Sequence, residues 1–344
     1  MQQTRPQNRT LIDSFGRTID YLRISVTKNC NFRCLYCMPN TPEIVDENVI
    51  ALPKMLEFLK IAMDFGVKKI RITGGEPLLR KDLSDFIAGI YAYKNGVEVA
   101  LTTNAYFLAR EAMNLKNAGL RRINISLDSL KADKIARISQ RDALQKIMEG
   151  IFTAKDAGLK IKLNMVPLRG VNDDEIVDML CFAGENGFLL RYIEYMSNSY
   201  ASGTIRGMRG DEILAILRER FAINIVKKDN FGPAKLYEFA SHPSLRDSNS
   251  ESKQSTASQN GIFGIIAPHS DDFCASCNRI RLTADGVICP CLYFEDAVDI
   301  SHAIEMGDKE AMKRGLLKSI CNKPEKNKWS KNEVSTRAFY HTGG

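Results

Sequence analysis

Residues 22–37 read LRISVTKNCNFRCLYC, an alternating apolar and polar run that leads into three closely spaced cysteines. The alternation predicts a β-strand, so we expect the cysteines on the loop that leaves its carboxyl end, where barrels and open parallel sheets build their sites. Cys30, Cys34 and Cys37 have the spacing C-x3-C-x2-C. Three thiolates spaced in this way can bind one face of a 4Fe–4S cube and leave its fourth iron open to a small molecule.

A zinc site, or a fortuitous group of thiols, is the alternative for this triplet, because zinc also accepts thiolate ligands. The surrounding sequence makes that alternative weaker, since no fourth Cys or His lies nearby and Tyr36 stands between the last two cysteines.

The cysteine count, the apolar segments and the net charge of the chain limit the cellular compartment and the kind of partner that are expected. The nine cysteines are an odd number, and most lie in two tight clusters, which favours metal ligation in a reducing compartment over disulfides. The first 17 residues lack the apolar segment of a secretory signal, and no apolar stretch approaches the ~18 residues of a membrane span. We therefore expect a cytoplasmic protein with no membrane partner. The net charge of +7 permits an anionic substrate but is too diffuse to indicate nucleic acid.

The first 220 residues alternate strand-like and helix-like segments. Strands are expected at 21–26, 69–73, 97–103, 122–127, 159–166 and 190–195, with helices at 53–65, 82–94, 108–118, 142–157 and 173–186. Six such units predict an α/β fold with a parallel sheet and crossover helices. Because a closed barrel of this type has eight units, we expect an open, partial (β/α)6 TIM-type barrel.

The pattern changes after residue 220. Strand-like runs follow at 223–227, 234–239, 262–266, 279–283 and 287–289, and 299–319 has helical character. The predicted organisation is an N-terminal segment at 1–19, the barrel at 20–220, a smaller α+β domain at 221–330 with a Ser-rich loop at 241–260, and a tail at 331–344.

Two further motifs carry chemistry. Thr73-Gly74-Gly75-Glu76-Pro77 follows the second expected strand; its glycines allow the backbone to approach a ligand closely, and Glu76 could accept from an ammonium group. Alone, this is a weak signal, because glycine pairs after strands are usually turns.

Farther on, C-x2-C at Cys274 and Cys277 precedes C-x-C at Cys289 and Cys291 across a predicted hairpin. Spacing alone leaves a zinc hairpin and an iron–sulfur site equally open.

Basic residues within apolar strands are the last signal. Arg23, Arg71 and Lys162 each stand in such a strand, and a charge there must be paired or face a polar cavity. Strand alternation also places Arg279 and Arg281 on one face beside the second cysteine group, where guanidinium groups suit a polyphosphate or a purine edge.

The cysteine triplet together with the Gly-Gly-Glu-Pro motif resembles the radical S-adenosylmethionine (SAM) superfamily. The runs LRISVT, RITGGEPL, LTTN, RINISLD and CNRIRLTADG, with the terminal Gly343 and Gly344, are similar to the molybdenum cofactor biosynthesis protein A family, GTP 3′,8-cyclase. The similarity extends from about residue 14 to the end of the chain.

The resemblance implies a role for individual residues. Cys30, Cys34 and Cys37 would hold the SAM cluster. A second 4Fe–4S cluster would be held by Cys274, Cys277 and Cys291. Cys291 is chosen over Cys289 because its distance in sequence from Cys277 fits the family. The SAM contacts would be Tyr36, Gly75, Ser126 and Met196. The GTP contacts would be Arg23, Arg71, Thr102, Lys162, Arg279, Ile280 and Arg281. The tail with Gly343 and Gly344 would insert toward the substrate.

The implied activity is that of a radical SAM lyase. It would convert GTP to 3′,8-cyclo-7,8-dihydro-GTP in the first step of molybdenum cofactor (molybdopterin) biosynthesis. It would use SAM, two 4Fe–4S clusters and a reduced flavodoxin- or ferredoxin-type electron donor, and pass its product to the next enzyme. A homodimer is left open. One alternative is a radical SAM peptide-modifying enzyme with an auxiliary cluster, which would need more C-terminal cysteines and no Gly-Gly end. Another is a zinc-stabilised nucleic-acid-binding module without turnover.

Overall fold

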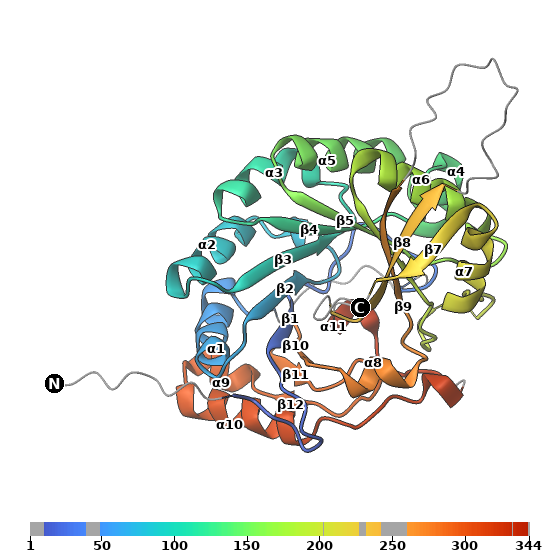
Figure 1. The fold of residues 1–344 in the computed structure, drawn as a ribbon. Coiled ribbons are helices and arrows are strands. Elements are labelled where there is room, and N and C mark those ends of the chain that lie inside the picture. Colours follow the sequence, from blue (N-terminus) through green and yellow to red (C-terminus); the bar gives the residue numbers. More distant parts are fainter. Residues whose placement is uncertain are drawn as a thin grey trace, which may run out of the picture.

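The structure of the chain is a computed structural model, and it describes residues 10–38, 49–201, 203–226, 232–241, 260–331 and 333–342. Six parallel strands follow one another in the sheet in chain order (Figure 1). They are β1 (Tyr21–Ser25), β2 (Lys69–Thr73), β3 (Glu98–Thr103), β4 (Arg122–Ser126), β5 (Lys160–Met165) and β6 (Leu189–Ile193).

Helices cover the outer face of this curved sheet (Figure 1). They are α1 (Leu52–Asp64), α2 (Leu83–Tyr93), α3 (Leu108–Asn117), α4 (Ala132–Ser139), α5 (Leu144–Asp156) and α6 (Ile176–Asn186). Each amphipathic helix buries its apolar side against the strands, as α1 does with Met55, Phe58 and Leu59, none of which is exposed. The predicted α/β fold with a partial (β/α)6 barrel is confirmed.

The C-terminal region extends the same sheet at both edges. Its strands are β7 (Phe221–Ile225), β8 (Ala234–Ser241), β9 (Asn260–Ile266), β10 (Arg279–Leu282), β11 (Val287–Cys289) and β12 (Val298–Asp299). β10 pairs in parallel with β1, and β9 pairs in parallel with β6. A sheet edge carries unpaired N–H and C=O groups, so this pairing satisfies the two edges that a six-stranded barrel would leave open. The C-terminal strands therefore share one sheet with the barrel.

The helical segment expected at 299–319 is two helices. α9 (Ser301–Met306) ends at Gly307, which has a φ of 69°, and α10 (Lys309–Cys321) begins after it with Asp308 as its N-cap. A positive φ ends a helix, and glycine adopts it without strain. The sequence did not predict α4, nor α7 (Gly210–Arg218), α8 (Asp271–Ala275) and α11 (Phe339–Thr342).

The Ser-rich loop expected at 241–260 lies almost entirely outside the described residues, as do Gly343 and Gly344. In the described part of the chain, no helix combines the length and the apolar character that crossing a membrane requires.

Candidate active site

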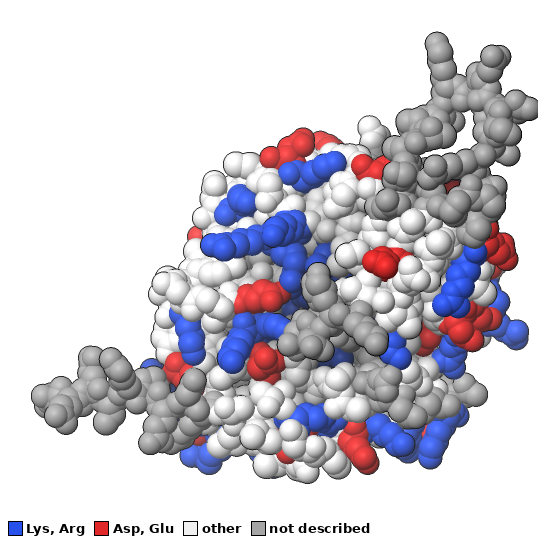
Figure 2. All heavy atoms as spheres, viewed as in Figure 1, with Lys and Arg blue, Asp and Glu red and all other residues white. Residues whose placement is uncertain are grey.

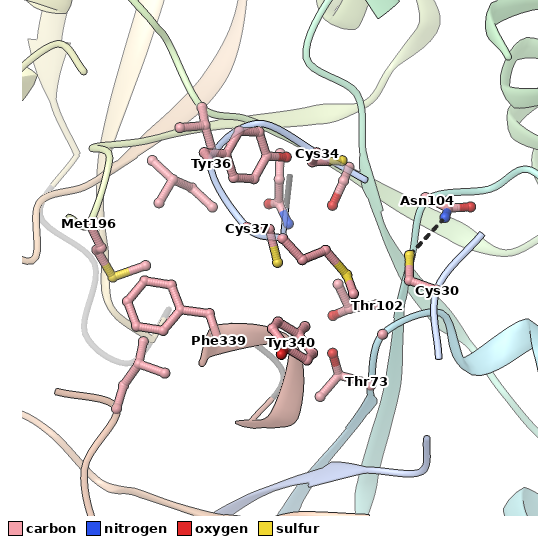
Figure 3. Close-up of a pocket in the computed structure, with 18 of the residues that line it drawn as sticks. Cys30, Cys34, Tyr36, Cys37, Thr73, Thr102, Asn104, Met196, Phe339 and Tyr340 are labelled. Carbon is pink, nitrogen blue, oxygen red and sulfur yellow. Dashed lines mark hydrogen bonds between the residues drawn. The ribbon is translucent and has the colours of Figure 1, made fainter. Parts of the chain in front are cut away.

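The cysteine triplet lies on the loop after β1, as predicted, and lines a pocket at the carboxyl ends of the barrel strands (Figure 3). The loop is held from two directions. Its own turn is closed by the Cys37 N–H, which donates to the Cys34 carbonyl at 2.9 Å. The end of α4 fixes it from outside, because the Arg33 N–H donates to the Ser139 carbonyl at 2.9 Å. The three side chains are half-buried.

Burial and mutual repulsion oppose deprotonation of these thiols. Burial, with the nearby Glu76 carboxylate, raises the pKa of Cys30 to about 12, and burial raises the pKa of Cys37 to about 12. Burial and its two neighbours raise the pKa of Cys34 well above the usual range. Three thiolates therefore require a cationic group between them, and the soft donor set fits the irons of a cluster. In the described residues, no three His, Cys, Asp or Glu side chains are arranged to hold a single metal ion.

The Gly-Gly-Glu-Pro loop after β2 packs directly on the loop after β1. The Gly75 N–H donates to the Thr27 carbonyl at 2.8 Å, and the Glu76 N–H donates to the Asn29 carbonyl at 2.7 Å. A Cβ added at Gly75 would lie 2.2 Å from the Asn29 oxygen. Glycine is therefore required here, because the two backbones lie in contact.

Glu76 anchors this loop to the end of β3. Its carboxylate accepts from the Thr103 hydroxyl at 2.6 Å, the Asn104 N–H at 2.8 Å and the Leu78 N–H at 3.0 Å. Burial raises its pKa to about 7, against these hydrogen bonds. Sequence reading considered Glu76 as an acceptor from an ammonium group, whereas in the structure its carboxylate already accepts three hydrogen bonds from the chain.

The residues expected to contact SAM surround the same pocket. Tyr36, Gly75, Ser126 and Met196 all line it. Met196 and Phe339 lie opposite the cysteine loop (Figure 3). The Tyr36 hydroxyl donates to Asp128, which follows β4 and also lines the pocket. The structure therefore brings together every residue that the resemblance assigned to SAM.

A second, strongly basic pocket adjoins the first. It is lined by four of the expected GTP contacts, which are Arg23, Arg71, Lys162 and Arg279. The strand register places Arg281, Arg23 and Arg71 side by side across β10, β1 and β2. Arg23 and Arg279 line both pockets, so the two spaces lie next to each other. In Figure 2, basic side chains gather over the region of β2 to β4, with acidic ones among them.

Crowded positive charge shifts the titration of groups in this basic pocket. Burial, with the charges of Arg122 and Arg191, lowers the pKa of Lys162 to about 8. Burial would raise the pKa of Tyr21, but Arg71 and other arginines outweigh it and lower that pKa to about 7. A polyanion entering the pocket would relieve this repulsion.

Two of the expected GTP contacts, Thr102 and Ile280, differ in whether their side chains line a pocket. Thr102 lines the first pocket, and its hydroxyl accepts from Arg71 Nη1 at 3.4 Å. Ile280 is fully buried in the hydrophobic core, because it points to the opposite face of β10 from Arg279 and Arg281. The Ile280 side chain therefore does not line the pocket, and a contact from this residue would have to come from its backbone.

In the second cysteine group, Cys274, Cys277 and Cys291 lie close to one another, and Cys289 is engaged elsewhere. Cys274 and Cys277 lie at α8 and just after it, and the charges of Cys277 and Cys291 both act on the pKa of Cys274, which burial raises. Cys289 is fully buried, and its Sγ accepts from Arg337 Nη1 at 3.0 Å. This arrangement favours Cys291 over Cys289 as the third member of the group.

The chain end reaches the pocket as well. Phe339 and Tyr340 of α11 line it, and Tyr340 packs with Met38 beside Cys30 and Cys37. The described part of the tail therefore packs against the cysteine loop.

Comparison with known proteins is consistent with this geometry. The chain matches the Radical SAM superfamily over residues 24–183 and Molybdenum Cofactor Synthesis C over residues 188–329. It is 51% identical to the GTP 3′,8-cyclase of Helicobacter pylori (strain J99) over 97% of this chain and 100% of that protein. It is 48% identical to the GTP 3′,8-cyclase of Aliarcobacter butzleri, with the same coverage. The chain belongs to the GTP 3′,8-cyclase family.

Solved structures agree on the fold of this family member. The crystal structure of Streptococcus suis SuiB bound to S-adenosylmethionine superposes with a TM-score of 0.59 at 15% identity, covering 88% of this chain and 68% of that one. Membership of the radical SAM superfamily implies a 4Fe–4S cluster and SAM, and the donor set at Cys30, Cys34 and Cys37 fits them.

The sequence did not predict that Arg191, Asp128 and Lys323 of this GTP 3′,8-cyclase family member belong to the site. Arg191 lies in the basic pocket and donates to Asn124 and Asn164; a charge within the expected strand 190–195 was the available signal. Asp128 was inside a quoted motif but had no assigned role. Lys323 contacts Cys277, and nothing in its local sequence distinguishes it from the other C-terminal lysines.

Proposed function

We propose that this chain cyclises GTP to 3′,8-cyclo-7,8-dihydro-GTP, joining ribose C3′ to guanine C8 in the first step of molybdenum cofactor biosynthesis. The observation that supports this most strongly is the pair of adjoining pockets, in which Arg23 and Arg279 line both the cysteine-lined pocket and the basic one. A nucleoside triphosphate has matching halves, because it carries a polyanion at one end and a largely uncharged ring system at the other.

When bound, a reduced 4Fe–4S cluster and SAM supply a 5′-deoxyadenosyl radical able to remove a hydrogen atom from an unactivated carbon. The residues of the chain do the remaining work of placement. Arg23, Arg71, Lys162 and Arg191 bind and orient the triphosphate. Phe339 and Tyr340 narrow the pocket and limit the access of water to the reacting atoms.

A second 4Fe–4S cluster at Cys274, Cys277 and Cys291 is part of the proposal. Arg279 and Arg281 line the pocket of the cysteine triplet from the strand that follows Cys277, so a purine bound by these guanidinium groups would lie near the residues that would hold this cluster. The GTP 3′,8-cyclases named above match 97% of this chain, whereas the likeness to SuiB concerns the fold alone. This favours a nucleotide over a peptide substrate.

The partners stay predictions. A reduced flavodoxin- or ferredoxin-type protein would supply the electron, the product would pass to the next enzyme of molybdopterin synthesis, and the cytoplasm is the expected compartment. Gly343 and Gly344, which lie outside the described residues, would dock near the substrate.

Isotope transfer tests the proposed reaction. The reconstituted chain is incubated anaerobically with SAM, dithionite and GTP deuterated at C3′. We expect deuterated 5′-deoxyadenosine and a product of the same elemental composition as GTP, separable from it by chromatography. Unlabelled 5′-deoxyadenosine formed without a GTP isomer would contradict the proposal. The Cys30→Ala variant, which removes a predicted cluster ligand, should form neither compound.

A further inference from the structure

Lys323 is buried against the second cysteine group. It follows α10, and only 3% of its surface is exposed. Its Nζ lies 3.4 Å from Cys277 Sγ and donates to the Arg279 carbonyl at 2.8 Å and the Pro290 carbonyl at 2.9 Å. The side chain thus ties the segment that carries Cys277 and Arg279 to the segment that carries Pro290 and Cys291.

The charge of this ammonium group has no carboxylate partner in the described part of the chain. A buried charge that meets only neutral carbonyls is costly, because carbonyl dipoles replace water incompletely. Within the described residues, the nearest group able to carry negative charge is the Cys277 sulfur, at 3.4 Å. The position of Lys323 therefore calls for an anion at these cysteines.

Hydrogen-bond donors surround the neighbouring cysteine too. The Asn327 backbone N–H and its side-chain Nδ2 lie 3.4 Å and 3.1 Å from Cys274 Sγ. Donors and positive charge next to ligating sulfurs are the levers by which a protein sets the reduction potential of an iron–sulfur cluster. Lys323 supplies the positive charge and Asn327 supplies the neutral donors.

We propose that Lys323 is the fixed counter-charge of the second cluster and that it raises the reduction potential of that cluster. This inference rests on the proposed second cluster. A thiolate-ligated cluster is more negative after reduction than before it, so a fixed positive charge stabilises the reduced form more than the oxidised form. Removing that charge makes the cluster harder to reduce.

The test uses the full-length chain with Cys30→Ala, Cys34→Ala and Cys37→Ala, so that only the second group can hold a cluster. Iron and sulfide are measured after reconstitution, and the midpoint potential is measured by a redox titration followed by electron paramagnetic resonance. Lys323→Met, which keeps the length of the side chain, should make the potential more negative. The ratio of reduced to oxidised cluster at a fixed solution potential should fall at least tenfold, which is about 59 mV for one electron.

Two further variants separate charge from shape. Lys323→Arg keeps the charge and should stay near the parent potential. Lys326→Met removes an equal charge three residues away, from an exposed side chain, and should change nothing. If Lys323→Met binds no iron while Lys323→Arg and Lys326→Met do, the charge is needed to retain the cluster, which also supports the proposal.

Other outcomes overturn it. An unchanged potential in Lys323→Met, or equal loss of iron in Lys323→Met and Lys323→Arg, would rule out the counter-charge. If the parent of this series holds no iron and sulfide, the second cluster and the role of Lys323 both fail. If Lys323→Met retains its iron and its potential is unchanged, the role of Lys323 fails but the second cluster stands.

Discussion

Tyr36 and Asp128 connect the cysteine loop to the end of β4 through a short hydrogen bond, in which the Tyr36 hydroxyl donates to Asp128 Oδ2 at 2.6 Å. Asp128 is itself fixed, because its Oδ1 accepts from the Val166 N–H at 2.9 Å. Both side chains line the pocket that contains the cysteines. The orientation of the Tyr36 ring is therefore set by a strand far from it in the sequence.

Tyr36→Phe should weaken SAM binding while leaving the cysteines in place. The change frees the ring, so SAM binding must order it again at a cost of about 0.5–1.5 kcal/mol, or roughly 2–10-fold in affinity. The dissociation constant of SAM for the reconstituted chain gives the measurement. Tyr93→Phe is the matched control, because Tyr93 makes the same kind of bond to Asp64 at an exposed place. Equal affinity in Tyr36→Phe and the parent would count against this role.

GTP affinity should fall as the pH rises from about 7 to about 9. The pKa of Tyr21 lies at about 7 and that of Lys162 at about 8. Above these values Tyr21 becomes an anion and Lys162 loses its positive charge, and each change makes the basic pocket less attractive to a polyanion. We expect a loss of roughly tenfold, since about 1–2 kcal/mol of charge interaction is removed.

Two substitutions assign this pH dependence. Lys162→Arg keeps its charge throughout the range and should remove the part of the loss centred near pH 8. Tyr21→Phe cannot ionise and should remove the part near pH 7. Calorimetry of GTP binding to the cluster-free chain measures this pH dependence without turnover. An affinity that rises with pH, or a profile unchanged in both variants, would show that neither group faces the phosphates.

The burial of Glu76 should make folding stability depend on pH. Its pKa is 4.5 in an exposed setting and about 7 in the fold, where burial favours the protonated form. The stability that this raised pKa contributes is fully present below about pH 4.5 and is lost as the pH rises through about 7. The size of the effect is roughly 2–4 kcal/mol.

Urea unfolding of the cluster-free chain at about pH 5 and about pH 8 measures that effect. Glu76→Gln should show a smaller difference between the two conditions than the parent does, whatever its overall stability. Glu310→Gln, at an exposed Glu on α10, should keep the parental difference. If Glu76→Gln kept it too, the pH dependence would have to come from other groups.

The barrel could be predicted from sequence because period-two strands and period-3.6 helices are local signals. The position of β9 and β10 could not, since Leu190 meets Phe263 and Arg23 meets Arg281 only through pairing of segments distant in the chain. The same limit applies to the site. Motifs identified the cysteines, whereas the contact of Lys323 with Cys277 exists only after the C-terminal segment has packed.

Cys291 and Cys289 should respond differently to removal, although they are two residues apart. Cys289 is fully buried, and its sulfur is already engaged by Arg337, whereas Cys291 is half-buried and its charge acts on Cys274. Because β11 ends at Cys289, Cys291 lies beyond the strand, and a cluster at Cys274 and Cys277 can recruit it without breaking the β10–β11 hairpin.

Cys291→Ala should therefore halve the iron and sulfide content of the reconstituted chain, from about two 4Fe–4S clusters to about one. Cys289→Ala should keep both clusters, because it removes only a packed sulfur and one hydrogen bond. Iron analysis with electron paramagnetic resonance of the reduced proteins distinguishes the two cases, and SAM cleavage should persist in both, since the first cluster is untouched. If Cys289→Ala lost a cluster and Cys291→Ala did not, the ligand assignment would be reversed, and Arg337 would then approach a ligating sulfur.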